Sequence, residues 1–140
     1  MTPASDLSRF VKAQEGSWPA ARAELRAGAK MTHWMWFIFP QLAALGRSLT
    51  AKYYGITGLE EAQDYLAHPV LGPRLHEATR AMLSHEDKSA EAVLGRTDAL
   101  KLRSSATLFD AAGGGPEFRA ILDVFYDGTP CPLTLAELGR

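Results

Sequence analysis

Apolar residues recur every three or four positions along most of the chain, which is the pattern of amphipathic helices packed around a core. Residues 58–69 show it most clearly, with a stripe formed by Leu59, Ala62, Tyr65 and Leu66. The acidic residues Glu60, Glu61 and Asp64 fall on the other side of this helix. We therefore expect those three carboxylates to face solvent.

Capping residues, glycines and prolines mark where the other helices begin and end. They predict a first helix from Ser5 or Asp6 to Gly16, and a second over residues 17–28. No strand pattern, repeat or linker follows, so the sequence predicts a single all-α domain over residues 1–140, a compact bundle of about seven to nine short helices. The further helical stretches are expected at residues 41–54 with a break at Gly46, 73–85, 89–94, from 97 or 98 to 112, 116–128, and from 132 or 134 onward.

Residues 31–39 stand apart because almost all of them are apolar or aromatic. Apolar side chains are too dense there to show either the helical or the strand period, so pattern alone does not separate a helix from a buried strand. We favour a helix that ends at Pro40, because proline stops or kinks a helix.

Composition and charge restrict the class of protein without identifying it. The 140 residues are 46% apolar, and fifteen Lys and Arg stand against sixteen Asp and Glu. Such a chain can bury one core and has no overall field to attract nucleic acid or an anionic membrane. Its longest apolar run, residues 34–39, is far shorter than the ~20 residues of a membrane-spanning helix. Because Cys131 is the single cysteine and the first ten residues carry no secretory signal, we expect a cytoplasmic protein.

Standard catalytic and cofactor motifs are missing from the sequence. It contains no phosphate loop, no Gly-x-Gly-x-x-Gly turn, no His-Glu-x-x-His and no Gly-x-Ser-x-Gly elbow. The histidines His33, His68, His76 and His85 have no metal-ligand spacing to one another. We therefore expect neither a metal nor a cofactor.

Two of the three tryptophans lie in the aromatic stretch, beside polar side chains. Large aromatic rings bury more area than other side chains, so one interpretation is a central core element. In the other interpretation some of the rings wall a pocket and stack on a planar ligand, while the polar neighbours orient it. The candidate ligand-binding residues of this stretch are Thr32, His33, Trp34, Trp36 and Gln41.

A second candidate segment lies on the helix expected to end at residue 112. Its helical wheel points Ser105 inward, places Lys101 and Ser104 beside it, and turns Arg103 and Thr107 outward. Ser105 is interpreted either as a hydroxyl bonded to the carbonyl one turn back or as part of a rim that holds a phosphate or carboxylate. The candidate ligand-binding residues here are Lys101, Arg103, Ser104 and Ser105.

Gln14 and Glu15 form the third candidate group. Gln14 falls on the apolar face of the first helix, where a buried, hydrogen-bonded amide and a ligand contact both fit the pattern. Glu15 is the carboxylate next to it and is the candidate catalytic residue.

Four longer stretches carry a family resemblance. They are residues 32–41 (THWMWFIFPQ), 54–56 (YGI), 68–75 (HPVLGPRL) and 101–109 (KLRSSATLF). Together they resemble the bacterial domain-of-unknown-function family DUF1810, some of whose members are labelled calpastatin, and the likeness covers nearly the whole chain. The resemblance implies a compact, all-helical single domain and no established activity.

Two short pieces, residues 10–14 and 94–96, are similar to the helical family associated with NAD and ADP-ribose (NADAR), some of whose members cleave N-glycosidic bonds. This likeness implies a small nucleotide-like ligand such as ADP-ribose. Cleavage would pass through an oxocarbenium-like state, for which a carboxylate orients water, an aromatic wall holds the base and cations bind phosphate. The residues that would fill these roles are Glu15 with Gln14, Trp34 with Trp36, and Lys101 with Arg103.

The alternative is a non-catalytic helical module that binds a protein partner or assembles with itself as a homo-oligomer. Aromatic side chains left on the surface would form such an interface. The two hypotheses predict different shapes, since a partner needs a flat exposed patch and a ligand needs a concave pocket with convergent polar groups. The polar residues that flank the aromatic stretch favour the pocket.

Overall fold

The computed structural model describes residues 6–140, and within that range it contains nine α-helices, one 3-10 helix and no strand. The prediction of an all-α fold is confirmed for these residues. In chain order the elements are α1 (Ser8–Ala27), α2 (Met35–Ile38), the 3-10 helix η1 (Ala43–Leu45), α3 (Leu49–Tyr53), α4 (Leu59–Ala67), α5 (Leu71–Leu83), α6 (Ala90–Leu94), α7 (Arg96–Ala111), α8 (Pro116–Phe125) and α9 (Pro132–Glu137).

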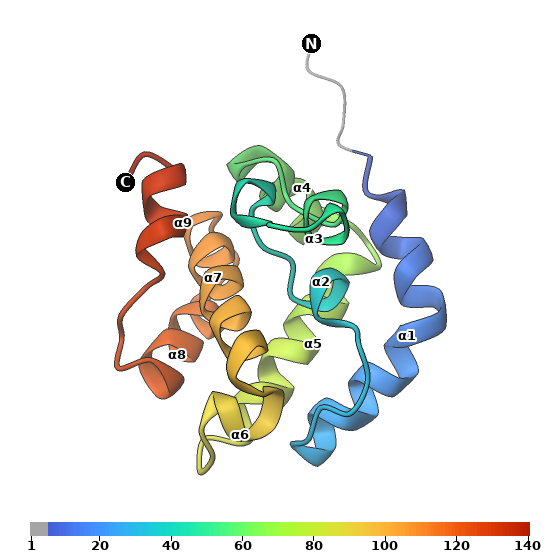
Figure 1. The fold of residues 1–140 in the computed structure, drawn as a ribbon, viewed down its shortest axis with the longest axis vertical. Helices are drawn as coiled ribbons and strands as arrows, with labels where there is room; N and C mark the ends of the chain where they lie inside the picture. The colour runs from blue at the N-terminus through green and yellow to red at the C-terminus, as the bar shows by residue number, and fades with distance from the viewer. Residues whose placement is uncertain (1–5) are drawn as a thin grey trace.

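Helix α5 runs through the middle of the molecule and separates its two sides (Figure 1). It packs against α1 on one side and α8 on the other, and also against α4. Helix α7 is the second organising element, because it contacts α4, α6, α8 and α9. The short helix α2 lies against α1 and α5, which places the aromatic stretch between the two sides.

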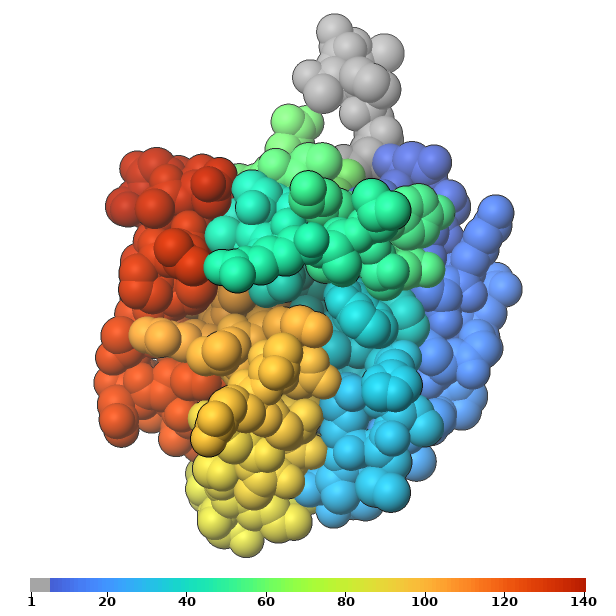
Figure 2. All heavy atoms as spheres, viewed as in Figure 1, coloured from blue at the N-terminus to red at the C-terminus, as the bar shows by residue number. Residues whose placement is uncertain are grey.

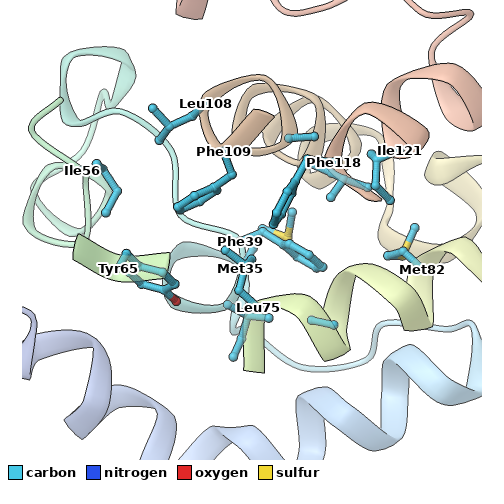
Figure 3. Packing of buried hydrophobic residues seen from close by; sticks show 14 of the residues in the cluster. Met35, Phe39, Ile56, Tyr65, Leu75, Met82, Leu108, Phe109, Phe118 and Ile121 are labelled. Carbon is cyan, nitrogen blue, oxygen red and sulfur yellow. The ribbon is translucent and has the colours of Figure 1, made fainter. Parts of the chain in front are cut away.

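The core is centred on a row of aromatic rings from three helices (Figure 3). Phe109 of α7 has its ring centroid 5.5 Å from that of Tyr65 on α4 and 5.7 Å from that of Phe118 on α8. All three side chains are buried. Aromatic pairs at these distances add about 0.5–1.5 kcal/mol each to the gain from buried area.

A single 20-residue helix, α1, stands where two helices were predicted. The predicted break at Gly16 was wrong, because Gly16 and Pro19 both lie inside α1. Helix stability in proteins comes mostly from packing of an apolar face, and α1 buries Phe10 and Leu25 on either side of these weak positions. The helix ends at Gly28 as predicted, with the left-handed φ of 75° that glycine adopts at helix ends.

The other helices lie near the predicted residues, with three differences at N-termini. Of the stretch 31–39, for which a helix was favoured, only Met35–Ile38 is helical, as α2. Helix α5 begins at Leu71, before the proline that was expected to start it. Helix α7 begins at Arg96 directly after Gly95, and no side chain caps it, so capping by Thr97 or Asp98 was wrong. Within the described residues, no helix has the length and apolar character needed to cross a membrane.

Residues 43–55, which we call the flap, leave the helical bundle and return to it at the same place. A short parallel bridge closes the base, where the Ala43 N–H donates to the Ile56 carbonyl and the Ile56 N–H donates to the Gln41 carbonyl, both at 2.8 Å. Gly55 is needed at this base, because a Cβ there would lie 2.3 Å from the Cα of Ala43. The flap is thus joined at its two ends, and between them Leu45 and Tyr54 pack against the core.

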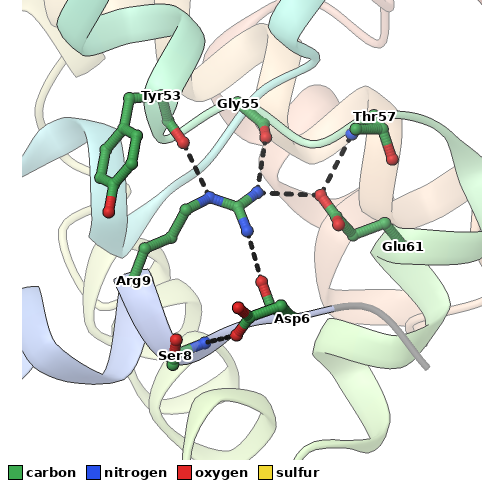
Figure 4. Close-up of polar contacts among 7 residues, drawn as sticks. All are labelled: Asp6, Ser8, Arg9, Tyr53, Gly55, Thr57 and Glu61. Atoms are coloured by element: carbon green, nitrogen blue, oxygen red, sulfur yellow. Dashed lines mark hydrogen bonds and ion pairs between the residues drawn. The ribbon is translucent and has the colours of Figure 1, made fainter. Parts of the chain in front are cut away.

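Arg9 of α1 fastens the C-terminal end of the flap (Figure 4). Its guanidinium donates to the carbonyls of Tyr53 (2.7 Å) and Gly55 (2.9 Å) and pairs with the Glu61 carboxylate (3.0 Å). The same Glu61 oxygen accepts the Thr57 N–H at 3.2 Å. Glu61 is 7% exposed, so the expectation that it faces solvent was wrong, because Arg9 from a distant helix covers it.

The N-cap of α1 is Leu7, so capping by Asp6 was wrong, but Asp6 lies one residue earlier and still binds the first turn. Its carboxylate accepts the Ser8 N–H at 3.0 Å, and hydrogen bonding by Ser8 lowers the pKa of Asp6 below its usual value. The Asp6 carbonyl accepts a hydrogen bond from Arg9 (2.6 Å), which ties this turn to the flap anchor. Ser5, the other predicted cap, lies outside the described residues.

Candidate functional site

A pocket of about 730 Å³ opens between α7, the flap and α9, and we call it the flap pocket. Figure 2 shows the surface receding where the green residues of the flap overhang the orange residues of α7. This volume lies within the range of roughly 300–1,000 Å³ that small-molecule sites occupy. The lining residues are Trp36, Gln41, Leu45, Gly46, Arg47, Ser48, Ala51, Thr97, Leu100, Lys101, Arg103, Ser104, Cys131, Pro132 and Leu133.

The two candidate segments therefore meet across a pocket. Trp36 and Gln41 from the aromatic stretch lie opposite Lys101 of α7, and the Lys101 ammonium is 5.0 Å from the centre of the Trp36 ring. That distance is within the range of a cation–π contact, so a positive charge lies next to the Trp36 ring at the pocket.

Arg103 and Ser104 line the pocket, but their hydrogen bonds serve to hold its wall. The Arg103 guanidinium donates to the carbonyls of Thr129 (2.9 Å) and Pro130 (3.0 Å), and the Ser104 hydroxyl lies 2.9 Å from that of Thr134. These contacts fasten the start of α9 to α7, which positions the Cys131–Leu133 wall.

Thr107 lies one turn further along α7 and was predicted to face outward. It is 3% exposed, and its hydroxyl donates to the Arg103 carbonyl (2.8 Å) and accepts the Cys131 N–H (2.9 Å). The prediction was wrong because the segment leading into α9 covers this side of α7. Helical periodicity in α7 alone carried no signal of that cover.

A second, smaller pocket of about 160 Å³ adjoins the first, and we call it the lysine pocket. It shares Trp36 and Lys101 with the flap pocket, and His33 lies at it as well. Its remaining lining residues are Lys30, Met35 and Asp98. Asp98 bridges the two lysines, 3.0 Å from Lys30 and 3.3 Å from Lys101.

Thr32 and Trp34 bind Glu24 of α1 and line neither pocket. The Glu24 carboxylate accepts the Thr32 N–H (2.9 Å) and hydroxyl (2.7 Å), the Met31 N–H (2.7 Å) and the Trp34 indole N–H (2.9 Å). Partial burial acts to raise the pKa of Glu24, but the hydrogen bonds from Thr32, Met31 and Trp34 outweigh it and lower the pKa to about 2. Glu24 thus fixes the chain that leads into α2.

Gln14 is a buried, hydrogen-bonded amide, 1% exposed. Its amide nitrogen donates to the Phe37 carbonyl (2.7 Å) and the Tyr65 hydroxyl (3.2 Å), and its oxygen accepts from Arg74 (3.3 Å). Burial raises the pKa of Tyr65, which keeps this hydroxyl protonated. Gln14 therefore joins α1, α2, α4 and α5 inside the core, and it lines neither pocket.

Glu15 and Ser105 also lie away from both pockets. Glu15 is exposed on α1, and Ser105 points inward as predicted and is 1% exposed. The structure therefore brings together six of the eleven candidates, and separates from them Gln14, Glu15, Thr32, Trp34 and Ser105. The six that line the two pockets are His33, Trp36, Gln41, Lys101, Arg103 and Ser104.

Sequence reasoning missed several residues of the site. Asp98 could have been found, because it lies three positions before Lys101 and such pairs meet on one side of a helix. Lys30 comes from the loop after α1, and Arg47 and Ser48 come from the flap, so their positions depend on how these loops fold back. No local pattern predicts that placement.

The fold and the site define a small all-α domain with two adjoining surface pockets, edged by a flap and carrying lysines next to the half-buried ring of Trp36. The chain belongs to the family described as protein of unknown function (DUF1810), whose model matches residues 4–138. The resemblance seen in the sequence is thereby confirmed.

A solved structure shows the same fold. The crystal structure of the conserved hypothetical protein Rv1873 from Mycobacterium tuberculosis is similar to this chain at 48% identity with a TM-score of 0.94. The match covers 96% of this chain and 97% of that one. No match was found among curated proteins. Function therefore has to be argued from the geometry of the site.

Proposed function

We propose that the flap pocket binds a small nucleotide-like ligand, one that joins a flat ring to an anionic group. The observation that carries the proposal is the pairing of Trp36 with Lys101 in the lining of a pocket of about 730 Å³. An aromatic face offers a planar group a stacking surface, and an ammonium beside it offers an anion a charge partner. Arg47 adds a second cation from the flap.

The rest of the pocket lining suits the ring of such a ligand. Leu45, Leu100, Pro132 and Leu133 provide apolar surface, and Gln41 adds an amide that can both donate and accept. Small-molecule sites are typically apolar with a few placed polar groups, which is the composition seen here.

We propose binding and do not extend the proposal to cleavage of an N-glycosidic bond. Cleavage by the route considered above needs a carboxylate at the ligand. Glu15, the candidate for that role, lines neither pocket, and Asp98 of the lysine pocket is held between two lysines. The ligand class proposed here is the one that the short NADAR-like pieces of the sequence imply, and cleavage of such a ligand stays a prediction.

A second candidate function is binding of a protein partner or a second copy of the chain at the same place. It is favoured by exposed leucines at the edge of the flap pocket, since Leu100 and Leu133 line it and are 63% and 65% exposed. Leu49, 89% exposed, lies next to the lining residue Ser48. Both functions would use the same pocket, so a ligand and a partner would compete.

Cys131 indicates the cellular compartment in which the protein works. It is a free thiol in the wall of the flap pocket. Free thiols persist in reducing compartments, so we propose a cytoplasmic location. This proposal is independent of the ligand.

A thermal-shift panel tests the proposed function. NAD, ADP-ribose, nucleoside phosphates and sugar phosphates are each added at millimolar concentration to the purified protein. A ligand present at a hundred times its Kd stabilises the folded state by about 2.7 kcal/mol, which raises Tm by several degrees.

Two tryptophan variants localise the effect. Trp36→Ala is expected to abolish the shift, whereas Trp18→Ala, on α1 and away from both pockets, retains it. If no compound of the panel shifts Tm, or if both variants respond equally, the proposed function is wrong.

A further inference from the structure

We infer that the lysine pocket is the phosphate subsite of the same ligand, so that the ring lies in the flap pocket and a terminal phosphate lies between Lys30 and Lys101. This inference rests on the proposed function and makes it more specific: the ligand class is a phosphate monoester of a nucleoside-sized molecule. Three properties of the pocket carry it, namely its charge, its size and the two lining residues that it shares with the flap pocket.

The charge of the lysine pocket is positive and partly withdrawn from water. Lys30, Asp98 and Lys101 carry two positive charges and one negative charge, with side chains that are 9%, 17% and 23% exposed. Interactions of such half-buried charges are screened less than those at the surface. One carboxylate thus holds two ammonium groups near each other and leaves a net positive charge at the pocket.

Each ammonium retains donors for a ligand. A lysine carries three N–H donors, and Asp98 is the single carboxylate that pairs with Lys30 and with Lys101 among the residues the structure describes. A phosphate has several acceptor oxygens and can accept from both lysines at once. The pair therefore matches a phosphate better than it matches a neutral group.

The size of the lysine pocket restricts what it can hold. At about 160 Å³ it has the volume of about five water molecules at ~30 Å³ each, which is room for a phosphate group and too little for a nucleoside. The larger part of the ligand must therefore lie elsewhere.

The shared lining indicates where that larger part lies. Trp36 and Lys101 line both pockets, so the two pockets lie next to each other at the Trp36 ring.

The lysine pocket is also held in place before any ligand arrives. The Lys30 N–H donates to the Val93 carbonyl at 2.8 Å, and the Lys30 ammonium lies 5.2 Å from the centre of the buried Trp34 ring. Asp98 sits in the first turn of α7. Preorganised donors bind an anion with little further loss of conformational freedom.

The test compares nucleosides with their own 5′-monophosphates, so that the pairs differ in the phosphate alone. Adenosine, guanosine, cytidine and uridine are each measured with AMP, GMP, CMP and UMP. The readout is protection of Cys131 from alkylation by N-ethylmaleimide, because Cys131 is the single cysteine and lines the flap pocket but not the lysine pocket.

For at least one base, the monophosphate is expected to protect at a concentration at least about fivefold lower than the nucleoside. Fivefold is what one unit charge about 4 Å away contributes even in bulk water. Inorganic phosphate alone, which cannot reach Cys131 from the lysine pocket, is expected to leave alkylation unchanged.

Two variants, one that removes a positive charge and one that removes a negative charge, distinguish an effect of charge from damage to the fold. Lys30→Gln is expected to remove the advantage of the monophosphate and leave protection by the nucleoside unchanged. Asp98→Asn frees both lysines and is expected to increase the advantage by about fivefold or more. Lys12→Gln, at an exposed position of α1, is the control and is expected to change neither value.

The outcomes distinguish the two claims. If neither nucleosides nor monophosphates protect Cys131 in the unmodified protein, the proposed function and the phosphate subsite are both wrong. If nucleosides and monophosphates protect equally, or if Lys30→Gln keeps the advantage, the flap pocket binds a ligand but the subsite is wrong. If Asp98→Asn and Lys30→Gln both weaken protection by nucleoside and monophosphate alike, the lysines serve the fold, and the subsite is again wrong.

Discussion

Trp34 and Trp36 are two positions apart in the chain and lie in opposite environments. Trp34 is 1% exposed, and its indole N–H is bound by Glu24 at 2.9 Å. Trp36 lines two pockets, with the Lys101 ammonium above its ring. One short segment therefore serves as core on one side and as a candidate binding surface on the other. The difference lies in the surroundings: Trp34 is buried with its indole N–H bound to Glu24, whereas Trp36 is half-buried and lines both pockets.

The largest expected effect follows from removing each tryptophan in turn. Trp34→Ala leaves a cavity in the core and deprives Glu24 of a donor, so it should lower the free energy of unfolding by about 3–5 kcal/mol. Trp36→Ala should lower the free energy of unfolding by about 1–2 kcal/mol, because Trp36 is only half-buried and its removal takes away less buried apolar area. Urea denaturation measures both values. Equal losses for the two variants would contradict the division between core and surface.

Gln14, like Trp34, belongs to the core, where it is part of a buried hydrogen-bond network. Gln14→Leu removes the donor to the Phe37 carbonyl and the acceptor for Arg74, so unfolding free energy should fall by about 2 kcal/mol. Binding at the flap pocket should stay unchanged, because Gln14 does not line it. Urea denaturation and the thermal-shift panel together check this. If a folded Gln14→Leu protein no longer responds to the ligand, the conclusion that Gln14 lies outside the binding site is wrong.

For Lys101, which lines both pockets, we expect a large effect on ligand affinity and a small effect on stability. Lys101→Met keeps most of the side-chain volume and removes the ammonium, so affinity for an anionic nucleotide should fall at least tenfold, the equivalent of about 1.4 kcal/mol. The ion pair with Asp98 is partly exposed, so stability should change by less than about 1 kcal/mol. Calorimetric titration measures the affinity. If Lys101→Met loses as much stability as Trp34→Ala, then Lys101 mainly stabilises the fold and the expectation is wrong.

The smallest expected effect is the pH dependence that Glu24 contributes. Because the folded-state pKa of Glu24 is lowered to about 2, its stabilisation is complete above the ordinary glutamate pKa of about 4.5 and is lost as pH falls toward 2. Solvent screening at this partly exposed group reduces the loss to about 1 kcal/mol. Glu24→Gln should remove this component from the stability measured between pH 5 and pH 2. An unchanged pH profile in Glu24→Gln would show that Glu24 does not hold Trp34 through its charge.

The fold could be predicted from the sequence where a helix has a one-sided apolar stripe. The stripe ending at Leu66 and the glycines after α7 placed their helices correctly, because local periodicity and backbone freedom decide such boundaries. The break at Gly16 was predicted wrongly because the burial of Phe10 and Leu25 against other helices overrides the local weakness. That burial is a property of the assembled bundle.

The site could be predicted in part. Trp36 and Lys101 were expected to be in the site from their residue types, and the structure places them together. Glu24, Asp98 and Lys30 were not singled out, because each acts through a partner that is distant in sequence or belongs to a loop. Residue type indicated what chemistry was available, and tertiary structure decided which groups meet.

The most direct test of the central claim is a titration followed by the three tryptophan indole N–H signals in an NMR spectrum. The chain contains Trp18, Trp34 and Trp36, so each signal reports on one environment. On addition of the nucleoside monophosphate with the largest thermal shift, the Trp36 signal should move most, with a saturable dependence on concentration, and the Trp18 signal should stay in place. A spectrum in which Trp36 is unaffected, or in which Trp18 moves instead, would contradict the account.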